Sequence, residues 1–596
     1  MRSSEPGLTK AMPLNPSRPP SNLAAPSRDV AWVAVICALP LALLVEPRQQ
    51  FGTDWIANLW LTAYYGEYFK HHLAFPEVIH TIQLAGIPYP VFYGILLYPL
   101  LGLISSLTDA HAAIRLAVGG AFFLQTWQVL RLMVQTGAPR RFALGTAALA
   151  CWSTYALTNL YNRGALSELI ATSLLTAAIC AVYRACLLPL GPLRWPPLAT
   201  GLLCIVLAAG THPITGLFGG TFFALVITVA WAGSHGRGQL AACLGAGAIA
   251  AAVVLSPWIY AVLKFGPSLY VTQLFITKLE YYPADIDSLS SRLMPFPFDR
   301  RVMENPNLSV NATPYLDAQV TVGLLLLALF LAVGLFDAGW RRLALQRAGL
   351  ALVLASWVSF IIILVISTSP ALGARLPAPF HKLQFAYRLV SYLNLSLLLA
   401  VVGSFMALSS DAARKLGSRP ATLVLGAILA LAASGLALKL QHGWANKSAA
   451  PKVSGSSALS LPVEFYGYYA YAVTQNLNGP APPGEALFLH VEQGPEFGRL
   501  TPERVSHATA EARRLKVQAF PWNVVRVNGQ PAINADTVNS AEGATITLPA
   551  GECEITYTWQ PDRLWVWLNI LSRGTLLALV ILVAVLHGRT VRAGSR

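Results

Sequence analysis

Charged residues are scarce in this chain of 596 residues. Asp, Glu, Lys and Arg make up 12% of it, against about a quarter in soluble globular proteins, while 55% of the residues are hydrophobic and the mean hydropathy is +0.53. Several uncharged apolar runs reach the roughly 20 residues that a helix needs to cross a bilayer. The composition excludes a soluble enzyme, a disordered scaffold and an outer-membrane barrel, and it predicts a polytopic membrane protein.

Cysteine and the common nucleotide-binding motifs are also sparse. Six of the seven cysteines lie in apolar segments, where a thiol packs as a small side chain, and only Cys553 lies in a polar region. No CxxC or Cys/His spacing indicates a metal site, and the chain has no GxxxxGK(S/T), GxSxG or HExxH motif. The sequence therefore predicts neither a metal nor a cofactor, and it gives no support for NTP-driven or NAD-dependent chemistry.

Acidic residues are fewer than basic ones. The chain has 42 Lys and Arg against 27 Asp and Glu, which gives a net charge of +15. Much of the excess lies in short loops between apolar runs and in both tails, where basic residues orient a chain in the bilayer. This distribution is poor support for nucleic-acid binding, and no nucleic-acid partner is expected.

Long apolar runs fill most of the first three quarters of the chain. If they alternate in direction, the Lys/Arg clusters of their short loops fall on one side, which places both chain ends in the cytoplasm. The short stretch 90–107 contains Pro99, and because parity allows one net crossing before Arg140, we interpret it as re-entrant. This leaves about 12 transmembrane helices, or about 13 if that stretch also crosses. The expected spans are 31–45, 112–134, 142–160, 164–187, 197–211, 214–232, 239–263, 319–338, 348–369, 386–408, 421–440 and 564–587.

The fold class predicted is an all-α polytopic membrane protein with a small β-sandwich outside the membrane. Segments of alternating polarity, such as WNVVRVNG and ECEITYTW, predict the strands, and Asn528 followed by Gly529 is typical of a hairpin turn. The expected parts are a disordered cytoplasmic tail at 1–29, a transmembrane domain at 30–440 with outer loops at 47–89 and 264–318, a periplasmic β-domain at 441–563, a last transmembrane helix at 564–587 and a cytoplasmic tail at 588–596.

Asp54 follows the first apolar run by a few residues, in FGTDW, and precedes an amphipathic stretch. A carboxylate at the membrane boundary is placed to accept a proton from a hydroxyl that enters from the aqueous side, so we predict Asp54 as a general base. The alternative is an aspartate that only caps the helix after it, and position alone gives the two roles about equal weight.

Other polar groups of the predicted outer loops are candidates for contact with a phosphate or a sugar. They lie in the first outer loop, in the turns YNRGALSE and GTHP, and in the segment after the span that ends near residue 369. The candidates are Glu67, Lys70, His71, Tyr89, Tyr161, Arg163, Glu168, His212, His381, Lys382 and Arg388.

Purely structural roles compete with these functional ones. An ion pair between Arg163 and Glu168 would stabilise the start of a span, while the functional alternative has Arg163 holding a phosphate and Glu168 orienting a sugar hydroxyl. His212 stands beside Pro213 at the end of an apolar run, where satisfying free backbone groups is the stronger expectation. Both alternatives stay open for each of these residues.

The outward-facing basic residues raise a similar choice. Lysines and arginines usually stay on the cytoplasmic side, so His381, Lys382 and Arg388 on the outer side favour a phosphate partner, with lipid headgroups as the alternative. His71 and His72 are adjacent, and because adjacent side chains diverge on a helix, a solvated face is the stronger expectation than metal binding.

Five short motifs together resemble the GT-C superfamily of polytopic glycosyltransferases: FGTDW, GIPYPVFY, YNRGALSE, GTHP and LQFAYR. The chain looks closest to a bacterial membrane-protein group labelled 6-pyruvoyl-tetrahydropterin-synthase-related, whose members show a Tyr-x-Arg-x-x-x-x-Glu turn and a Gln-Phe-Pro-Trp-Arg-like motif. Here the second motif reads QFAYR at 384–388, so Pro and Trp are replaced. Many GT-C enzymes carry an Asp-Glu or Asp-x-Asp pair where their essential acid stands, and the first outer loop of this chain, at 47–89, has neither, which favours a metal-independent member.

The resemblance implies an inverting transfer of a sugar from a polyprenyl-phosphate donor to an acceptor. Asp54 would be the general base for the acceptor hydroxyl, and Arg163, Lys382 and Arg388 would stabilise the departing lipid phosphate. A lipid-carried donor needs an apolar groove beside a polar pocket, which helix ends at a membrane surface can provide.

The resemblance also implies where the reaction takes place and with which partners. Glu168 and His212 would position the sugar at a site that faces the periplasm, in a bacterial inner membrane. The partners would be a polyprenyl-phosphate sugar, membrane lipids, and an acceptor such as a pilin-like surface protein, lipid A or a polysaccharide. The β-domain would hold the acceptor.

Two other classes of function remain open from the sequence. A transporter or lipid flippase also needs many spans and charges that face a cavity, although repeated halves or paired broken helices are not seen here. A noncatalytic protein of surface-polysaccharide assembly would use the outer domain to bind glycans and would tolerate the loss of Asp54.

Overall fold

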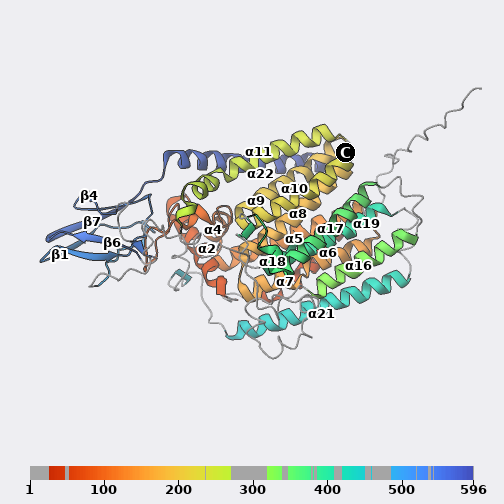
Figure 1. Ribbon diagram of the computed structural model, residues 1–596, viewed down its shortest axis with the longest axis horizontal. Coiled ribbons are helices and arrows are strands. Elements are labelled where there is room, and N and C mark those ends of the chain that lie inside the picture. Colours follow the sequence, from red (N-terminus) through yellow and green to blue (C-terminus); the bar gives the residue numbers. More distant parts are fainter. Residues whose placement is uncertain are drawn as a thin grey trace, which may run out of the picture.

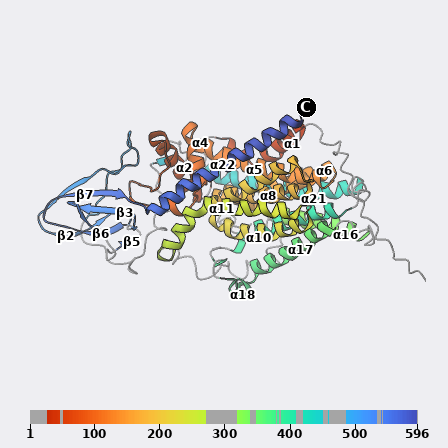
Figure 2. The ribbon, with the colours of Figure 1, turned by 90° about the horizontal axis from the view of Figure 1, so that it is seen from above.

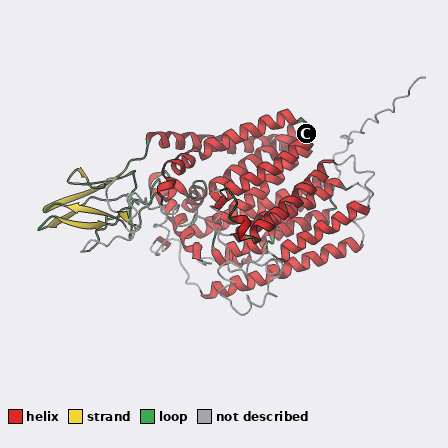
Figure 3. Cartoon of the chain, in the orientation of Figure 1, coloured by secondary structure: helices red, strands yellow, loops and turns green. Residues whose placement is uncertain are grey.

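The structure is a computed structural model. It describes residues 26–46, 51, 53–234, 236–269, 318–337, 347–377, 380–381, 386–408, 419–449, 458–459, 485–518, 520–533, 539–540 and 543–594. Helices form an elongated body, and two small sheets project from one end of it (Figure 1; Figure 3). We call this the sheet end and the far side the opposite end, where the chain's C-terminal helix finishes (Figure 1).

The helical body is built from the following elements in chain order. Its first part holds α1 (Pro26–Ala38), η1 (Ala42–Val45), α2 (Thr53–His72), α3 (Tyr89–Phe92), α4 (Leu97–Leu107), α5 (Ala110–Gln135), α6 (Arg140–Cys151), α7 (Thr154–Thr158) and a π-helical turn η2 (Asn159–Arg163). Its middle holds α8 (Leu166–Leu187), η3 (Pro192–Arg194), α9 (Trp195–Thr211), α10 (Pro213–Gly233), α11 (Arg237–Phe265) and η4 (Gly266–Ser268). Its last part holds α16 (Ala318–Asp337), α17 (Arg347–Thr368), α18 (Pro370–Gly373), η7 (Ala386–Leu389), α19 (Val390–Ala407), α21 (Arg419–Ala449) and α22 (Arg563–Gly594).

Within the described residues, eight helices are long and apolar enough to cross a membrane: Leu166–Leu187, Pro192–Thr211, Pro213–Ala232, Arg237–Ser268, Gly349–Thr368, Val390–Ala407, Arg419–Gln441 and Arg563–Arg589. The apolar windows of α8 and α19 are 89% and 83% buried, so these two helices form the centre of the body. The window of α22 is only 6% buried, and α22 runs along the outside of the body from the sheet end to the opposite end (Figure 2). The predicted polytopic, mainly helical membrane protein is confirmed.

Several predicted spans are shorter or interrupted. The helix expected at 31–45 ends at Ala38, two residues before Pro40, because proline cannot continue the backbone hydrogen bonds. The run at 142–160 breaks after Cys151, where the Ser153 side chain accepts a hydrogen bond from the backbone N–H of Ala156 at 3.2 Å and starts a new helix. In the stretch interpreted as re-entrant, α4 has 11 residues, roughly 16 Å of helix, which is about half the thickness of a hydrocarbon core.

The outer domain contains two antiparallel sheets. Four strands pair in the order β1 (Glu503–His507), β7 (Gly551–Trp559), β3 (Asn523–Val527) and β4 (Gln530–Pro531), and three pair in the order β2 (Glu511–Leu515), β6 (Gly543–Leu548) and β5 (Asn539–Ser540). Buried side chains such as Leu515, Val525, Ile546 and Ile555 form one core between them. The predicted turn joins β3 to β4, with Asn528 and Gly529 at φ +49° and +80°, the left-handed backbone of a two-residue hairpin. The small β-domain is thereby confirmed, although α21 continues to Ala449, past its predicted start at 441.

The first outer loop is joined to this domain by backbone hydrogen bonds. Ala85 donates to the carbonyl oxygen of Lys516 and accepts from the N–H of Gln518, both at 2.9 Å. The Nδ2 of Asn523 donates to the carbonyl oxygen of Gly86 at 2.7 Å, and the N–H of Gly86 donates to Nδ1 of His80 at 3.0 Å. Burial lowers the pKa of His80 to about 3, so its ring is a neutral acceptor at ordinary pH. The loop therefore packs as part of the outer domain as far as the start of α3.

Candidate functional site

Asp54 lies in the first turn of α2. Hydrogen bonds from the next turn of the helix hold this turn in place. One turn on, the amide of Asn58 donates to the carbonyl oxygen of Asp54 at 2.7 Å and to that of Gly164 at 3.0 Å. Tyr98 donates to Oδ1 of the same Asn58 at 2.9 Å. These bonds hold the start of α2 against the turn that precedes α8.

Gly164 permits this close approach. Its φ is +73°, a left-handed conformation that side chains with a Cβ rarely adopt. A Cβ at this position would lie 2.4 Å from the backbone nitrogen of Trp55, far closer than van der Waals contact allows. The glycine thus brings the turn that carries Arg163 directly against the residue after Asp54.

Glu168 is the centre of a hydrogen-bonded cluster at the start of α8. Its Oε1 accepts hydrogen bonds from Tyr155 OH at 2.6 Å and from Asn159 Nδ2 at 3.3 Å. Its Oε2 lies 3.4 Å from Arg163 Nη1 and 3.4 Å from Arg388 Nε. Only 5% of the Glu168 side chain is exposed, so a buried carboxylate holds the two arginines beside each other.

Asp54 lies close enough to this cluster for its charges to act on the Asp54 carboxyl group. The residue is exposed, yet protein surrounds its carboxyl group closely enough that restricted hydration raises its pKa above the ordinary value. The positive charges of Arg163 and Arg388 oppose this shift, and the negative charge of Glu168 adds to it. The four charges thus form one charged cluster, in which Asp54 is the exposed carboxylate.

His212 and Tyr93 lie on another side of the same cluster. Nδ1 of His212 lies 2.8 Å from Thr215 Oγ1 and accepts the Thr215 N–H at 3.3 Å, so the histidine caps α10. Burial, together with Arg388 and Arg163, lowers the pKa of His212 to about 4, although Glu168 acts in the opposite direction. The rings of His212 and Tyr93 meet edge to face, with centroids 6.1 Å apart.

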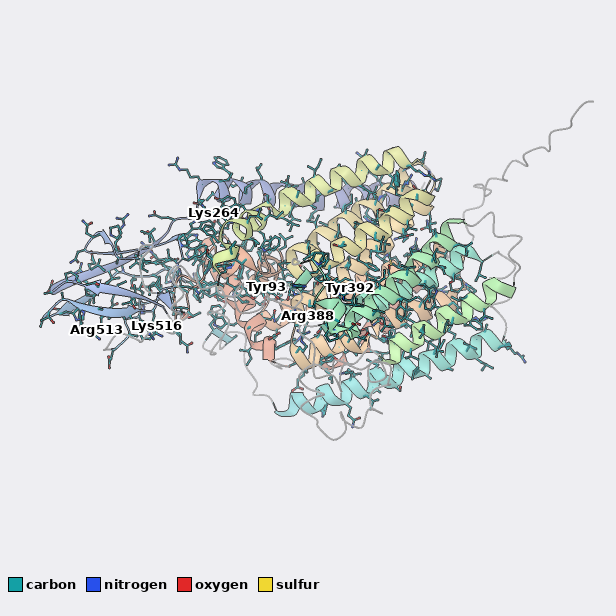
Figure 4. All side chains as sticks on the ribbon, viewed as in Figure 1. Tyr93, Lys264, Arg388, Tyr392, Arg513 and Lys516 are labelled. Atoms are coloured by element: carbon teal, nitrogen blue, oxygen red, sulfur yellow. The ribbon has the colours of Figure 1, made fainter. Side chains whose placement is uncertain are left out.

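Tyr93 brings a phenol to the cluster from the connection between α3 and α4. Its OH lies 2.6 Å from Ser167 Oγ, and it interacts electrostatically with Arg388, Asp54 and Glu168. Figure 4 shows Tyr93 and Arg388 in the helical body near Tyr392, which follows Arg388 by one helical turn. The site therefore draws on five separate segments of the chain.

Some predicted site residues lie away from this charged cluster. Glu67 and Lys70 form an exposed ion pair at 2.6 Å near the far end of α2, about 20 Å along the helix from Asp54. The ring of His71 stacks on Phe497 of the outer domain, with centroids 6.1 Å apart. Of these three side chains, His71 therefore contacts the outer domain, and Glu67 and Lys70 pair with each other.

The other predicted site residues lie in different environments, some buried in the helical body and one outside the described residues. Tyr161 is fully buried and donates to the carbonyl oxygen of Pro40 at 2.6 Å, which is a packing role. Tyr89 is buried and packs its ring against Tyr93, with centroids 5.5 Å apart. His381 is half-buried seven residues before Arg388, and Lys382 lies outside the described residues.

Sequence reasoning missed Tyr93, Tyr155 and Asn159. Tyr155, Asn159 and Arg163 are spaced by four residues in an otherwise apolar run, which is the spacing of one face of a helix, and that spacing was visible in the sequence. Tyr93 is the last residue of the GIPYPVFY motif, but only Tyr89 of that motif was among the predicted site residues. In the part of the chain that the structure describes, no three His, Cys, Asp or Glu side chains gather as metal ligands would.

No family model and no curated protein matches this chain. Two solved structures are similar to it. The cryo-EM structure of the arabinofuranosyltransferase AftD from Mycobacteria is 17% identical, with a TM-score of 0.41, and the match covers 71% of this chain and 27% of AftD. The crystal structure of ArnT from Cupriavidus metallidurans, bound to undecaprenyl phosphate, is 14% identical, with a TM-score of 0.38, and the match covers 80% of this chain and 84% of ArnT.

The chain spans about a quarter of the length of AftD and most of the length of ArnT. At these identities and TM-scores, the likeness by itself says nothing about the substrates of this chain.

Proposed function

We propose that this chain is a GT-C-type glycosyltransferase that moves a sugar from a polyprenyl-phosphate donor to an acceptor outside a bacterial inner membrane. The observation that carries the proposal is the charged cluster in which the exposed Asp54 lies near Arg163 and Arg388, both of which form ion pairs with Glu168. It lies where α8, α10 and α19 begin, so polar groups and apolar helices adjoin, as a lipid-linked donor requires.

In the proposed reaction, Asp54 takes the proton of an acceptor hydroxyl while that oxygen attacks the anomeric carbon of the donor sugar. A new glycosidic C–O bond forms as the bond between the sugar and the lipid phosphate breaks, and the phosphate leaves with both bonding electrons. A single displacement of this kind inverts the anomeric configuration. A carboxylate with a raised pKa is a better base, because it binds the proton more strongly in the transition state.

The two arginines have a distinct role in this scheme. Negative charge grows on the departing phosphate, and guanidinium groups that are already held in place stabilise it without reorganising. Glu168 keeps Arg163 and Arg388 side by side despite their repulsion and is therefore a positioning residue. His212 and Tyr93 are proposed to contact the sugar, and Lys382 is proposed as a third cation for the phosphate.

The test of this function is mass spectrometry of surface glycans, lipid A and abundant surface proteins from source-organism cells without the gene. A sugar that is lost from one acceptor and restored by the wild-type gene would support the transferase and identify the acceptor. Unchanged glycans in the deleted strain would contradict a transferase and favour transport or a noncatalytic assembly role.

The pH dependence of transfer tests the electrostatics of Asp54. Activity requires ionised Asp54, so kcat/KM should rise with pH through a pKa above the usual value of about 4. Arg388→Gln removes a positive charge that lowers this pKa, so the acid limb should move to higher pH. The exposed Arg375→Gln, in the same segment, is the matched control and should leave the limb in place.

His212 titrates in the same range and has to be separated from Asp54. His212→Asn removes the titrating ring, so the acid limb should persist in this variant if Asp54 produces it. An acid limb that disappears in His212→Asn, or one that does not move in Arg388→Gln, would show that Asp54 is not the titrating base.

A further inference from the structure

Three arginines and a histidine lie at the opposite end of the helical body, away from the charged cluster around Glu168. Arg131 comes from the end of α5, Arg184 from the last turn of α8, Arg194 from η3 and His587 from α22. Arg184 interacts electrostatically with both Arg131 and His587. His587 is held by α9, since its Nε2 lies 3.0 Å from Thr200 Oγ1. We call these four residues the basic end cluster.

Neutral groups hold Arg184 in this cluster. Its Nη1 donates to Oε1 of Gln128 at 2.6 Å, and its carbonyl oxygen accepts from Nε2 of Gln135 at 3.0 Å. Its Nε is buried and finds no hydrogen-bond partner among the described residues. Arg194 is 2% exposed, which makes it one of the most deeply buried charged side chains described.

No described Asp or Glu forms an ion pair with Arg131 or Arg184, and the strongest charged neighbour of Arg184 is another arginine. Bringing guanidinium groups together in a partly dry site is unfavourable unless an anion joins them. Phosphate matches this need, because the planar guanidinium fork binds two phosphate oxygens at once.

The surface beside the cluster is apolar. Leu187, Leu190 and Leu193, in the connection between α8 and η3, are 36%, 55% and 59% exposed. Arg131 lies over the ring of Trp127, 5.5 Å from its centroid. Exposed leucines next to partly buried arginines suit a molecule with a phosphate head and hydrocarbon chains, and basic pockets between helix ends are known to bind such headgroups.

We infer that the basic end cluster binds the phosphate of an anionic phospholipid whose acyl chains lie against Leu187, Leu190 and Leu193. The bound lipid would join the ends of α5, α8 and α22, three helices whose charged ends otherwise repel. This site is independent of glycosyl transfer and lies at the opposite end of the helical body, away from α2 at the sheet end (Figure 1).

Lipid binding to the full-length protein tests the site. The protein in neutral detergent micelles is titrated with phosphatidylglycerol or phosphatidylcholine, and native mass spectrometry gives the lipid-bound fraction. The wild type should bind phosphatidylglycerol at least about tenfold more tightly than phosphatidylcholine. Arg184→Gln and Arg131→Gln should each weaken phosphatidylglycerol binding about tenfold, the size expected for one charge-assisted contact.

Arg237→Gln is the matched control, because it removes an exposed arginine from the start of α11 without touching the cluster. It should bind phosphatidylglycerol like the wild type. Equal affinity for both lipids, or wild-type affinity in Arg131→Gln and Arg184→Gln, would overturn the proposal. Displacement of phosphatidylglycerol by millimolar inorganic phosphate would show a site for a free anion and would also overturn it. If Arg184→Gln does not fold, the half-buried Arg131 decides the question alone.

Discussion

Asp54→Asn is expected to slow sugar transfer by about 10²–10⁴-fold, the usual contribution of a general base. The amide has the size of the carboxyl group but cannot accept the proton of the acceptor hydroxyl. Because Asp54 is exposed, the substitution removes little packing, and asparagine serves nearly as well as aspartate at the start of a helix. Folding and binding of a polyprenyl phosphate should therefore persist while kcat falls.

Asp109→Asn is the matched control for this result. Asp109 is also an exposed aspartate at a helix start, and its Oδ1 accepts the N–H of Ala112 at 2.9 Å, which caps α5. The two variants are compared in kcat, in binding of undecaprenyl phosphate and in glycan restoration by the deleted strain. Transfer should be lost only in Asp54→Asn. Full activity of Asp54→Asn would mean that this residue, like Asp109, is only a helix cap.

Gly164→Ala is expected to destabilise the protein and to abolish most of its transfer activity. Alanine in the left-handed region costs about 1–2 kcal/mol, and its Cβ would also meet Trp55 N at 2.4 Å and Phe51 O at 3.0 Å. The backbone on one side has to move, and this displaces Asp54 relative to Arg163. A misplacement of about 1 Å in an active site can cost on the order of 10²-fold in rate.

Gly137→Ala separates the two contributions to that loss. Gly137 has φ +83°, and a Cβ there would meet nothing within 4 Å, so this variant has the backbone cost without the clash. Thermal unfolding in detergent and kcat/KM are measured for both. Gly137→Ala should lose stability alone, while Gly164→Ala should lose more stability and also activity. Equal losses in the two variants would show that the contact between the glycine turn and α2 does not position Asp54.

The membrane architecture followed from properties that are local in sequence. Long apolar helices satisfy their backbone hydrogen bonds within one segment, so length and hydropathy were enough to predict α8, α9, α10, α11 and α17 nearly to their ends. The hairpin at Asn528 and Gly529 is equally local, since two residues with positive φ specify it. Proline at position 40 and serine at position 153 ended helices where hydropathy alone predicted continuous spans.

Parts of the site were also predictable, for the same reason. Arg163 and Glu168 are five residues apart on one turn, and their contact was anticipated as an ion pair. Tyr155 and Asn159 repeat at the helical spacing before Arg163 and were overlooked although the pattern was present. The role of His212 as a cap of α10 matches the structural alternative that the neighbouring proline suggested.

What the sequence determined by itself was the class of protein, the order of its helices and strands, and a set of polar residues at their outer ends. Only the tertiary structure decided which of these residues meet. Glu168 lies 220 positions before Arg388 yet bonds to it, Tyr93 and not Tyr89 reaches Ser167, and Gly86 is held by Asn523 from 437 positions away. The physical reason is that hydropathy and backbone hydrogen bonding act within a segment, whereas an active site forms where helices pack against one another, and that packing depends on the shapes of all the surfaces that meet.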